Sequence, residues 1–172
     1  MRCIQRRVIV LFDQVSSLVR KCVQQKIVAF DTFGRFPDAV FEPDISRRQE
    51  FIEEAGDKSI SKDELTSLLE DLNLYENIEL VEGDILETAP SYIQSNPHMK
   101  LSLLHIDVDL FEPTKACLEC FYTHVVRGGI VILDDYGAFP GANKAIDGFL
   151  HDKAVVIQKL PYSHQISFVE KP

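Results

Sequence analysis

Short apolar segments alternate with amphipathic stretches from Lys26 to the end of the chain. The apolar segments are rich in β-branched residues and mostly continuous, which is typical of strands buried on both faces of a sheet. The stretches between them are expected to be helices, so the order of elements predicts βαβ units and a parallel sheet covered on both faces. The expected strands are Ile27–Thr32, Ile78–Glu82, Leu101–Asp107, Ile130–Asp134, Ala154–Lys159 and Gln165–Val169.

Two helix starts can be recognised from their residue types. Ser61-Lys-Asp-Glu64 has the spacing of a capping box, which predicts a helix that begins there and ends near Leu72. Glu112-Pro113 places a proline in the first turn of another helix, which continues through Thr114–Val125. Gly128-Gly129 is expected to end that helix.

The last two expected strands are joined only by residues 160–164. That link is too short for a parallel crossover, so these strands should pair as an antiparallel hairpin. With 172 residues, of which 45% are hydrophobic, the chain can bury one substantial core but not two. We therefore expect a single α/β domain over residues 1–172.

Charge and composition exclude several classes of partner. The formal net charge of -9 would repel nucleic acid and anionic lipid, and no run of Lys and Arg overrides it. No apolar run approaches the roughly 20 residues that span a bilayer, which predicts a cytoplasmic protein. The four cysteines, Cys3, Cys22, Cys117 and Cys120, are too sparse for a disulfide scaffold. Cys117-x-x-Cys120 lacks a second pair, which favours reduced, buried thiols over a zinc or redox site.

Acidic residues follow four of the expected strands where each strand ends. They are Asp31, Asp84, Asp107 with Asp109, and Asp134 with Asp135. In an open parallel sheet the ligand site lies beyond the carboxyl ends of the strands. One acid at a strand end is usually a helix cap or a loop residue, but four strands ending this way indicate a site.

The acids after two of these strands should converge. If the strands that end at Asp107 and Asp134 are neighbours, their ends lie about 4.8 Å apart, and alternation places Asp107 and Asp109 on the same side. Several carboxylates within about 4–6 Å cannot all stay ionised unless a cation offsets them, and such ligands suit Mg²⁺ better than zinc. Proton sharing or helix capping by the same acids is the alternative interpretation.

Four segments, in the correct order, resemble the successive motifs of the TylF/MycF-type macrocin O-methyltransferases, which are class I S-adenosylmethionine-dependent enzymes. They are Phe30-Asp-Thr-Phe-Gly-Arg-Phe-Pro37, Glu82-Gly-Asp-Ile85, His105-Ile-Asp-Val-Asp-Leu-Phe-Glu-Pro-Thr114 and Gly128-Gly-Ile-Val-Ile-Leu-Asp-Asp-Tyr-Gly137. An alternating β/α chain that ends in one antiparallel pair is also similar to the sheet of class I methyltransferases. The resemblance implies a Rossmann-like, doubly wound, mostly parallel sheet with an antiparallel strand pair at the C-terminus.

The resemblance also implies roles for the acids at the strand ends. Asp31 would bind the ribose of S-adenosylmethionine, Asp84 and Ile85 its adenine, and Asp109 would be the general base. The Mg²⁺ ligands would be Asp107, Asp134 and Asp135. A sugar hydroxyl becomes a competent nucleophile when its proton is removed or its pKa is lowered, which a base and Mg²⁺ supply. The implied function is Mg²⁺-dependent O-methylation of a sugar hydroxyl on a small molecule or natural product.

Several other residues have two interpretations. His105 and His124 are alternative bases, although a histidine in a strand is more often a satisfied core residue. Tyr136 and Phe139 follow the paired aspartates, where they either line the acceptor pocket or pack the loop. A homo-oligomer is compatible with the sequence.

The segment before Lys26 departs from the family pattern. Val8–Phe12 fits the first strand and Gln14–Gln25 the following helix, but the turn between them has no glycine, and none precedes Gly34. Glycines in such a turn let the backbone approach the donor. We expect residues 1–25 to be truncated, divergent or mispredicted. The alternatives are therefore a non-catalytic or fragmentary relative with impaired cofactor binding, or a catechol-type O-methyltransferase, which shares the carboxylates.

Overall fold

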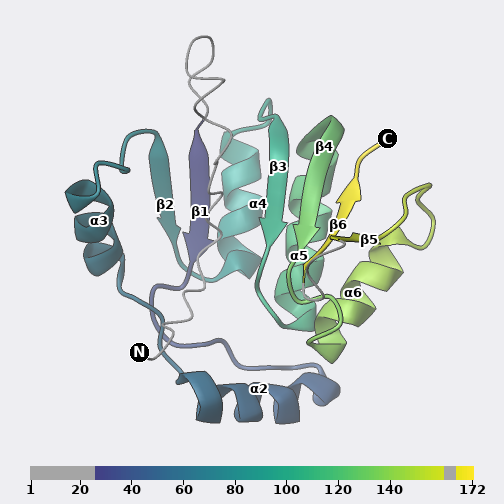
Figure 1. Cartoon of the computed structure of the whole chain (residues 1–172), viewed down its shortest axis with the longest axis horizontal. Coiled ribbons are helices and arrows are strands. Elements are labelled where there is room, and N and C mark those ends of the chain that lie inside the picture. The colour runs from purple at the N-terminus through teal and green to yellow at the C-terminus, as the bar shows by residue number, and fades with distance from the viewer. Residues whose placement is uncertain (1–25, 161–165) are drawn as a thin grey trace.

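Strands and helices alternate along the chain in a computed structural model that describes residues 26–160 and 166–172. The strands are β1 (Ile27–Asp31), β2 (Ile78–Glu82), β3 (Leu101–Ile106), β4 (Val125–Leu133), β5 (Gln158–Lys159) and β6 (Ser167–Glu170). The helices are α2 (Glu42–Ala55), α3 (Lys62–Asp71), α4 (Ile85–Ser95), α5 (Phe111–Phe121) and α6 (Pro140–Leu150), with a 3₁₀ turn, η1 (Tyr122–His124). Figure 1 shows their arrangement.

Parallel pairing dominates the first part of the fold and antiparallel pairing the last. β1 pairs in parallel with β2, and β3 pairs in parallel with β4. β6 runs antiparallel to both β4 and β5, as expected for the hairpin. Within the described ranges the strands form two sheets, β1–β2 and β3–β4–β6–β5, which lie side by side. The predicted α/β class and the antiparallel carboxyl-terminal pair are confirmed.

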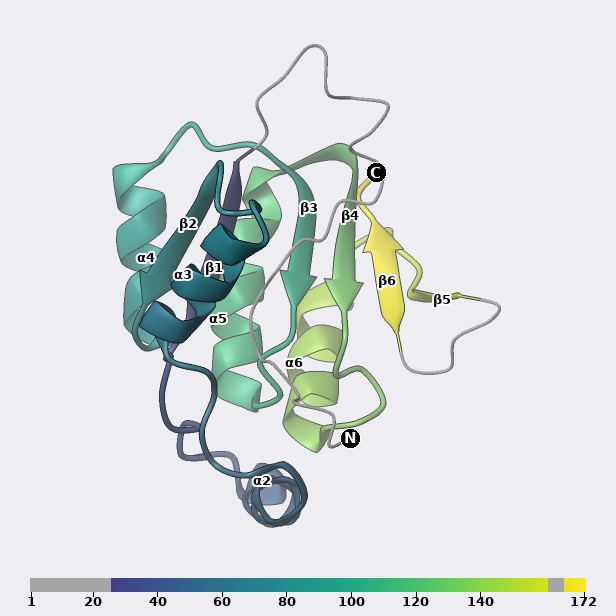
Figure 2. The ribbon, with the colours of Figure 1, turned by 60° about the vertical axis from the view of Figure 1, so that its left-hand side comes forward.

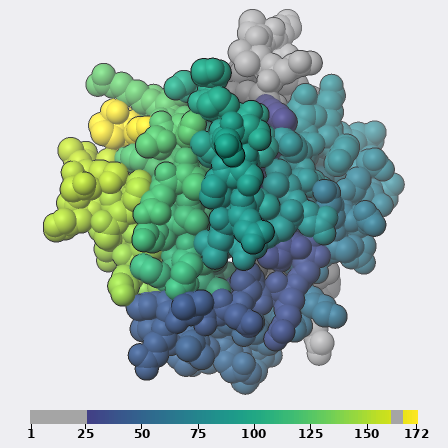
Figure 3. Space-filling model, turned by 180° about the vertical axis from the view of Figure 1, so that it is seen from behind, coloured from purple at the N-terminus to yellow at the C-terminus, as the bar shows by residue number. Residues whose placement is uncertain are grey.

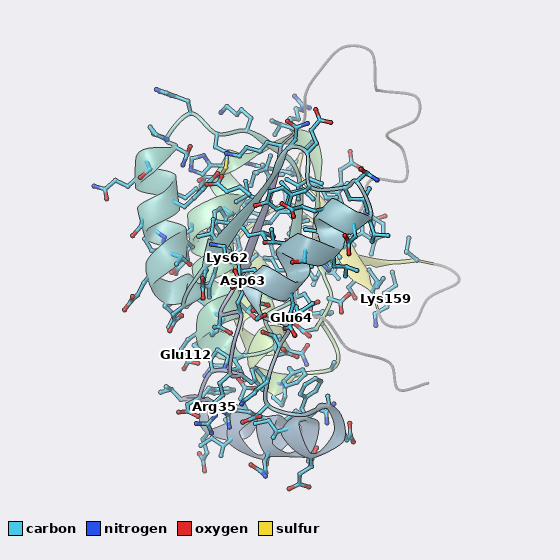
Figure 4. The ribbon with its side chains drawn as sticks, turned by 90° about the vertical axis from the view of Figure 1, so that its left-hand side faces the viewer. Arg35, Lys62, Asp63, Glu64, Glu112 and Lys159 are labelled. Carbon is cyan, nitrogen blue, oxygen red and sulfur yellow. The ribbon has the colours of Figure 1, made fainter. Side chains whose placement is uncertain are left out.

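Helices cover the strands in layers. Figure 4, with Lys62, Asp63 and Glu64 labelled at the start of α3, shows α3 on one side of β1 and β2 and α4 on the other. α4, α5 and α6 form the opposite surface of the molecule (Figure 3). Between these helices and the strands lies the main core, whose most buried members include Leu118, Val131 and Ile146. In the part of the chain that the structure describes, no helix is long and apolar enough to span a membrane.

The helix α2 stands apart from these layers. It lies across the end of the molecule toward which the parallel strands point (Figures 1 and 2). Its start carries Pro43 and two acids, Glu42 and Asp44, in the first turn. Proline and acids suit a first turn, because the backbone N–H groups there have no partner within the helix and carry partial positive charge.

The local helix signals in the sequence are confirmed. The Ser61 side chain accepts a hydrogen bond from the Glu64 N–H (3.3 Å), and the Glu64 carboxylate accepts one from the Ser61 N–H (3.1 Å). The helix that follows buries Leu65 and Leu69. Pro113 lies in the first turn of α5, as predicted.

The predicted boundary between α5 and β4 was wrong. α5 ends at Phe121, and Gly128-Gly129 lies within β4 rather than ending the helix. The pairing of β3 with β4 shifts register here, and a Cβ at Gly129 would lie 2.7 Å from the Val125 side chain. The glycines therefore form a bulge in the strand, where crowding excludes a larger residue.

Other boundaries differ by less. Thr32, Asp107 and Asp134 each lie just beyond the strand that was expected to include them, and Ala154–Lys159 contributes only Gln158–Lys159 as a strand. Cys117 and Cys120 are free thiols, and burial raises the pKa of Cys117 to about 12, which favours an unreactive thiol. The expected strand Val8–Phe12, helix Gln14–Gln25, Cys3 and Cys22 lie outside the described residues.

Candidate active site

A pocket opens at the carboxyl ends of the parallel strands, between the strand ends and α2. Its lining comes from the end of β1, the segments that follow β1, β2 and β3, the last turns of α2 with the loop after it, and the first turns of α4 and α5. It includes Asp31, Asp84, Ile85, Asp107 and Asp109, which the sequence analysis singled out. Acids predicted for donor binding and for chemistry therefore face the same pocket.

Asp31, the last residue of β1, is held at the pocket by its own loop. Its Oδ1 accepts hydrogen bonds from the Phe33 N–H (2.5 Å) and from the Ser59 hydroxyl (3.1 Å). Phe33 has a φ of 49°, so the chain turns sharply after the strand. Ser59 lies 28 residues further along the chain and was not anticipated from the sequence. These two donors fix the orientation of the carboxylate.

Asp84 follows β2 and begins α4. Its Oδ1 accepts a hydrogen bond from the Leu86 N–H (2.9 Å), so it is the N-cap of that helix. Gly83 before it has a φ of 134°, and its N–H donates to the Asp31 carbonyl (3.0 Å). Ile85, in the first turn of α4, is buried at the pocket. The parallel register of β1 and β2 thus places Asp31 and Asp84 at adjacent strand ends.

Three carboxylates meet after β3 and β4, and we call Asp107, Asp109 and Asp135 the acid cluster. One oxygen from each lies within 4.8 Å of the others. The cause is the strand pairing: Ile106 of β3 lies opposite Leu133 of β4, so the segments that follow the two strands begin side by side. Asp107 and Asp109 line the pocket, whereas Asp135, which is 7% exposed, is not part of its lining.

Asp135 accepts hydrogen bonds from the backbone, yet its surroundings disfavour its ionised form. Its Oδ2 accepts hydrogen bonds from the Val108 N–H (3.1 Å) and the Asp109 N–H (2.7 Å). Burial, followed by the charge of Asp109, raises the pKa of Asp135 well above its usual value, although the Asp109 N–H acts in the opposite direction. A cation bound at the acid cluster would relieve this repulsion.

Asp109 has an unusual backbone conformation. Its φ is 60°, in the left-handed region that residues other than glycine seldom adopt, and the Leu110 N–H closes a short turn onto the Val108 carbonyl (2.6 Å). The side chain is 3% exposed. Backbone strain of this kind is concentrated at functional sites, where the surrounding structure holds it in place.

Asp134, the remaining acid after β3 and β4, lies beside His105. Asp134 is absent from the acid cluster, and its Oδ1 lies 3.7 Å from Nε2 of His105. Burial by itself lowers the pKa of His105, but the carboxylates of Asp134 and Asp107 raise it, and the net shift is upward. Of the three predicted ligands, Asp107 and Asp135 lie together and Asp134 does not join them. Asp109 takes the third place in the cluster.

The remaining candidates lie outside the pocket lining. His124 is at the amino ends of β3 and β4, with its Nδ1 3.2 Å from the Met99 carbonyl. Tyr136 donates a hydrogen bond to Asp147 on α6, and Phe139 is buried with its ring 6.0 Å from that of Phe51 on α2. Both aromatic residues pack the loop before α6, which was one of the two interpretations.

Asp44 on α2 is a residue of this region that the sequence analysis missed. It is fully buried, and its two oxygens accept hydrogen bonds from the Phe111 N–H (2.9 Å) and the Gly141 N–H (2.7 Å). Those N–H groups belong to the first turns of α5 and α6. The sequence signal was weak, because an acid after a proline in a first turn is usually exposed to solvent.

Comparisons with known proteins identify the family to which the chain is related. The sequence model described as macrocin-O-methyltransferase (TylF) matches residues 11–160. No curated protein sequence matches the chain significantly. Among solved structures, the calicheamicin methyltransferase CalS11 superposes with a TM-score of 0.71 at 30% sequence identity, over 85% of this chain and 60% of that one.

Two further structures extend the comparison. An apo structure of CalS11, described as a TDP-rhamnose 3'-O-methyltransferase, gives a TM-score of 0.59 at 27% identity, over 85% of this chain and 58% of that one. The O-methyltransferase NovP gives a TM-score of 0.74 at 22% identity, over 90% of this chain and 63% of that one, and this likeness shows the fold alone.

The chain therefore spans about 60% of the length of CalS11. The family match covers most of the chain, including the segments after β1, β2, β3 and β4 that contribute the acids of the site. The chain belongs to the macrocin O-methyltransferase (TylF) family.

Proposed function

We propose that this protein transfers a methyl group from S-adenosylmethionine to a sugar hydroxyl, with Mg²⁺ bound at the acids that follow β3 and β4. One observation carries the proposal. A single pocket is lined by Asp31, Asp84 and Ile85 on one side and by Asp107 and Asp109 on the other. Residues suited to a nucleoside thus share a cavity with residues suited to a metal and a base.

The donor would lie between β1 and β2. Asp31, oriented by Ser59 and the Phe33 N–H, is suited to accept hydrogen bonds from ribose hydroxyls. Asp84 and the buried Ile85 offer a polar edge and an apolar face to an adenine ring. The donor supplies an already activated methyl group, so these residues need only hold and orient it.

The residues present fit a divalent cation. The acid cluster provides hard oxygen ligands, and the raised pKa of Asp135 reflects the burial and repulsion that a cation would offset. Two ligand sets are possible, and both contain Asp107 and Asp135. The geometry of the acid cluster adds Asp109 as the third ligand, whereas the family resemblance adds Asp134. Bound Mg²⁺ would lower the pKa of the acceptor hydroxyl.

Asp109 is our proposed general base, because it is buried, faces the pocket and is held rigidly by its turn. It takes the proton of the hydroxyl as the oxygen gains the methyl group. His105 is the alternative base, and its Nε2 faces Asp134. A sugar acceptor is proposed because CalS11, at 30% identity, is a relative described as acting on TDP-rhamnose.

Mg²⁺ should raise the midpoint temperature of unfolding of this chain. The ion relieves repulsion within the native acid cluster and has little affinity for the unfolded chain, so at 100 times its dissociation constant it should add about 2.7 kcal/mol of stability. Asp107→Asn should abolish the effect. Asp134→Asn should abolish it only if Asp134 is the third ligand. Thermal unfolding by circular dichroism tests this, and equal midpoints in Mg²⁺ and in EDTA would contradict the metal site.

The affinity for Mg²⁺ should rise with pH. The pKa of Asp135 is raised, so this carboxyl holds a proton at pH values where an ordinary aspartate is ionised, and the metal must displace that proton. Calorimetric titrations in two buffers with different ionisation enthalpies should show proton release, and release should fall as the pH increases. Binding that releases no proton at any pH would show that Asp135 is not a ligand.

The chain should bind S-adenosylhomocysteine weakly. Asp31 and Asp84 can hold the nucleoside half, but Asp13–Ser17, expected from the sequence to form the turn at the methionine half and outside the described residues, contains no glycine. Losing a few hydrogen bonds to charged groups, at about 1.5–3 kcal/mol each, weakens a micromolar site to the millimolar range.

Calorimetric titration with S-adenosylhomocysteine measures this, and Asp31→Asn should weaken binding further. A micromolar dissociation constant would show that donor binding does not require a glycine before Lys26. No binding at millimolar ligand would favour the non-catalytic relative over the enzyme.

Asp109→Asn should lower turnover by about 10²- to 10⁴-fold without weakening donor binding, because a general base acts in the transition state. The assay uses TDP-rhamnose as a trial acceptor, millimolar donor and saturating Mg²⁺. His105→Gln is the matched control and should retain most of the activity. Unchanged turnover in Asp109→Asn, with a large loss in His105→Gln, would assign the base to the histidine.

A further inference from the structure

Asp44 joins three helices through one buried carboxylate. It lies in the first turn of α2 and is 0% exposed. Its Oδ2 accepts the N–H of Phe111, the first residue of α5, and its Oδ1 accepts the N–H of Gly141, the second residue of α6. These contacts span 67 and 97 residues of sequence.

The amino-terminal ends of α5 and α6 stabilise the Asp44 carboxylate. The first N–H groups of a helix have no partner within it and carry partial positive charge, which suits an anion. No Lys, Arg or His among residues 26–160 and 166–172 forms an ion pair with Asp44, so α5 and α6 together supply the compensation. A Cβ at Gly141 would overlap the Asp44 carboxylate. The contact therefore requires glycine at that position.

The two helix starts that Asp44 holds are continuous with the acidic segments. Phe111 comes two residues after Asp109, and Gly141 comes six residues after Asp135. From the other side, Asp135 accepts the N–H groups of Val108 and Asp109. The segment from β3 to α5 is thus held between two carboxylates, one of which belongs to the acid cluster.

We propose that Asp44 is a positioning residue for the metal site: by holding the starts of α5 and α6, it sets the distance between the acids after β3 and the acids after β4. This inference rests on the proposed function, because it requires that the acid cluster binds a divalent cation. Asp44 itself does not line the pocket and acts only through the two helix starts.

The test compares Mn²⁺ binding, followed by the electron paramagnetic resonance signal of free Mn²⁺, in the parent chain and two variants well below their unfolding temperatures. Asp44→Asn keeps the shape of the side chain but turns a donor toward one of the two N–H groups. Residues that hydrogen-bond metal ligands contribute about 10- to 100-fold to affinity, and because Asp44 acts one step further from the ligands we expect a loss of about 10-fold.

Arg48→Met is the matched control. Arg48 lies on the same helix and donates hydrogen bonds to the carbonyls of Phe36 and Pro37, away from α5 and α6. It should leave the affinity for Mn²⁺ unchanged. Equal affinities in the parent chain and Asp44→Asn, or equal losses in both variants, would overturn the inference while leaving the metal site intact. Absence of Mn²⁺ binding by the parent chain would overturn the proposed metal site and this inference together.

A second measurement uses the unmodified chain, in case Asp44→Asn does not fold. Coupling between two sites is reciprocal, so Mg²⁺ should slow hydrogen exchange at the Phe111 and Gly141 amides by a factor comparable to the affinity that Asp44 contributes. The Leu72 amide, bonded to the Leu68 carbonyl at the end of α3, is the control and should not change. Unchanged exchange at Phe111 and Gly141, with Mg²⁺ bound, would overturn the inference.

Discussion

The segment that leads from β3 into α5 is held by two buried carboxylates from distant parts of the chain. Asp135 accepts the N–H groups of Val108 and Asp109, and Asp44 accepts that of Phe111. Backbone N–H groups at a helix start need partners, and buried carboxylates are stable only when they are hydrogen-bonded. Here the carboxylates supply the acceptors that the N–H groups need, and the N–H groups supply the hydrogen bonds that the carboxylates need. The end of β3, the start of α5 and the position of α2 are therefore fixed by the same kind of contact, a buried carboxylate that accepts backbone N–H groups.

This arrangement explains how the fold tolerates a concentration of acids. The N–H groups that donate to Asp135 favour its ionised form, whereas burial and the charge of Asp109 favour its protonated form. The second effect is larger, so the pKa of Asp135 is raised. The acid cluster is thus organised by hydrogen bonds between the Asp135 carboxylate and the backbone of the segment after β3. A divalent cation bound there would offset the repulsion between the carboxylates of Asp135 and Asp109.

The sequence predicted the parts of the site that follow from periodicity and strand pairing. Asp31, Asp84 and Asp107 were identifiable because parallel strands end at one edge of a sheet, and the capping box was identifiable because its contacts are local. Asp44 was not, because its burial depends on helices 67 and 97 residues away. Gly128-Gly129 was misassigned because glycine pairs both end helices and form bulges in strands.

The proposed in-line methyl transfer would require the donor and the acceptor oxygen to be held at a fixed distance, and the two halves of the pocket come from different sheets. α2 bridges them. Its Arg48 holds the carbonyls of Phe36 and Pro37, in the segment after β1, while its Asp44 holds the starts of α5 and α6. Through these contacts α2 is tied both to the segment after β1, on the nucleoside side, and to the starts of α5 and α6, on the acid side. α2 therefore contributes to the pocket both as part of its lining and, through Asp44, by holding the helix starts that follow the acidic segments.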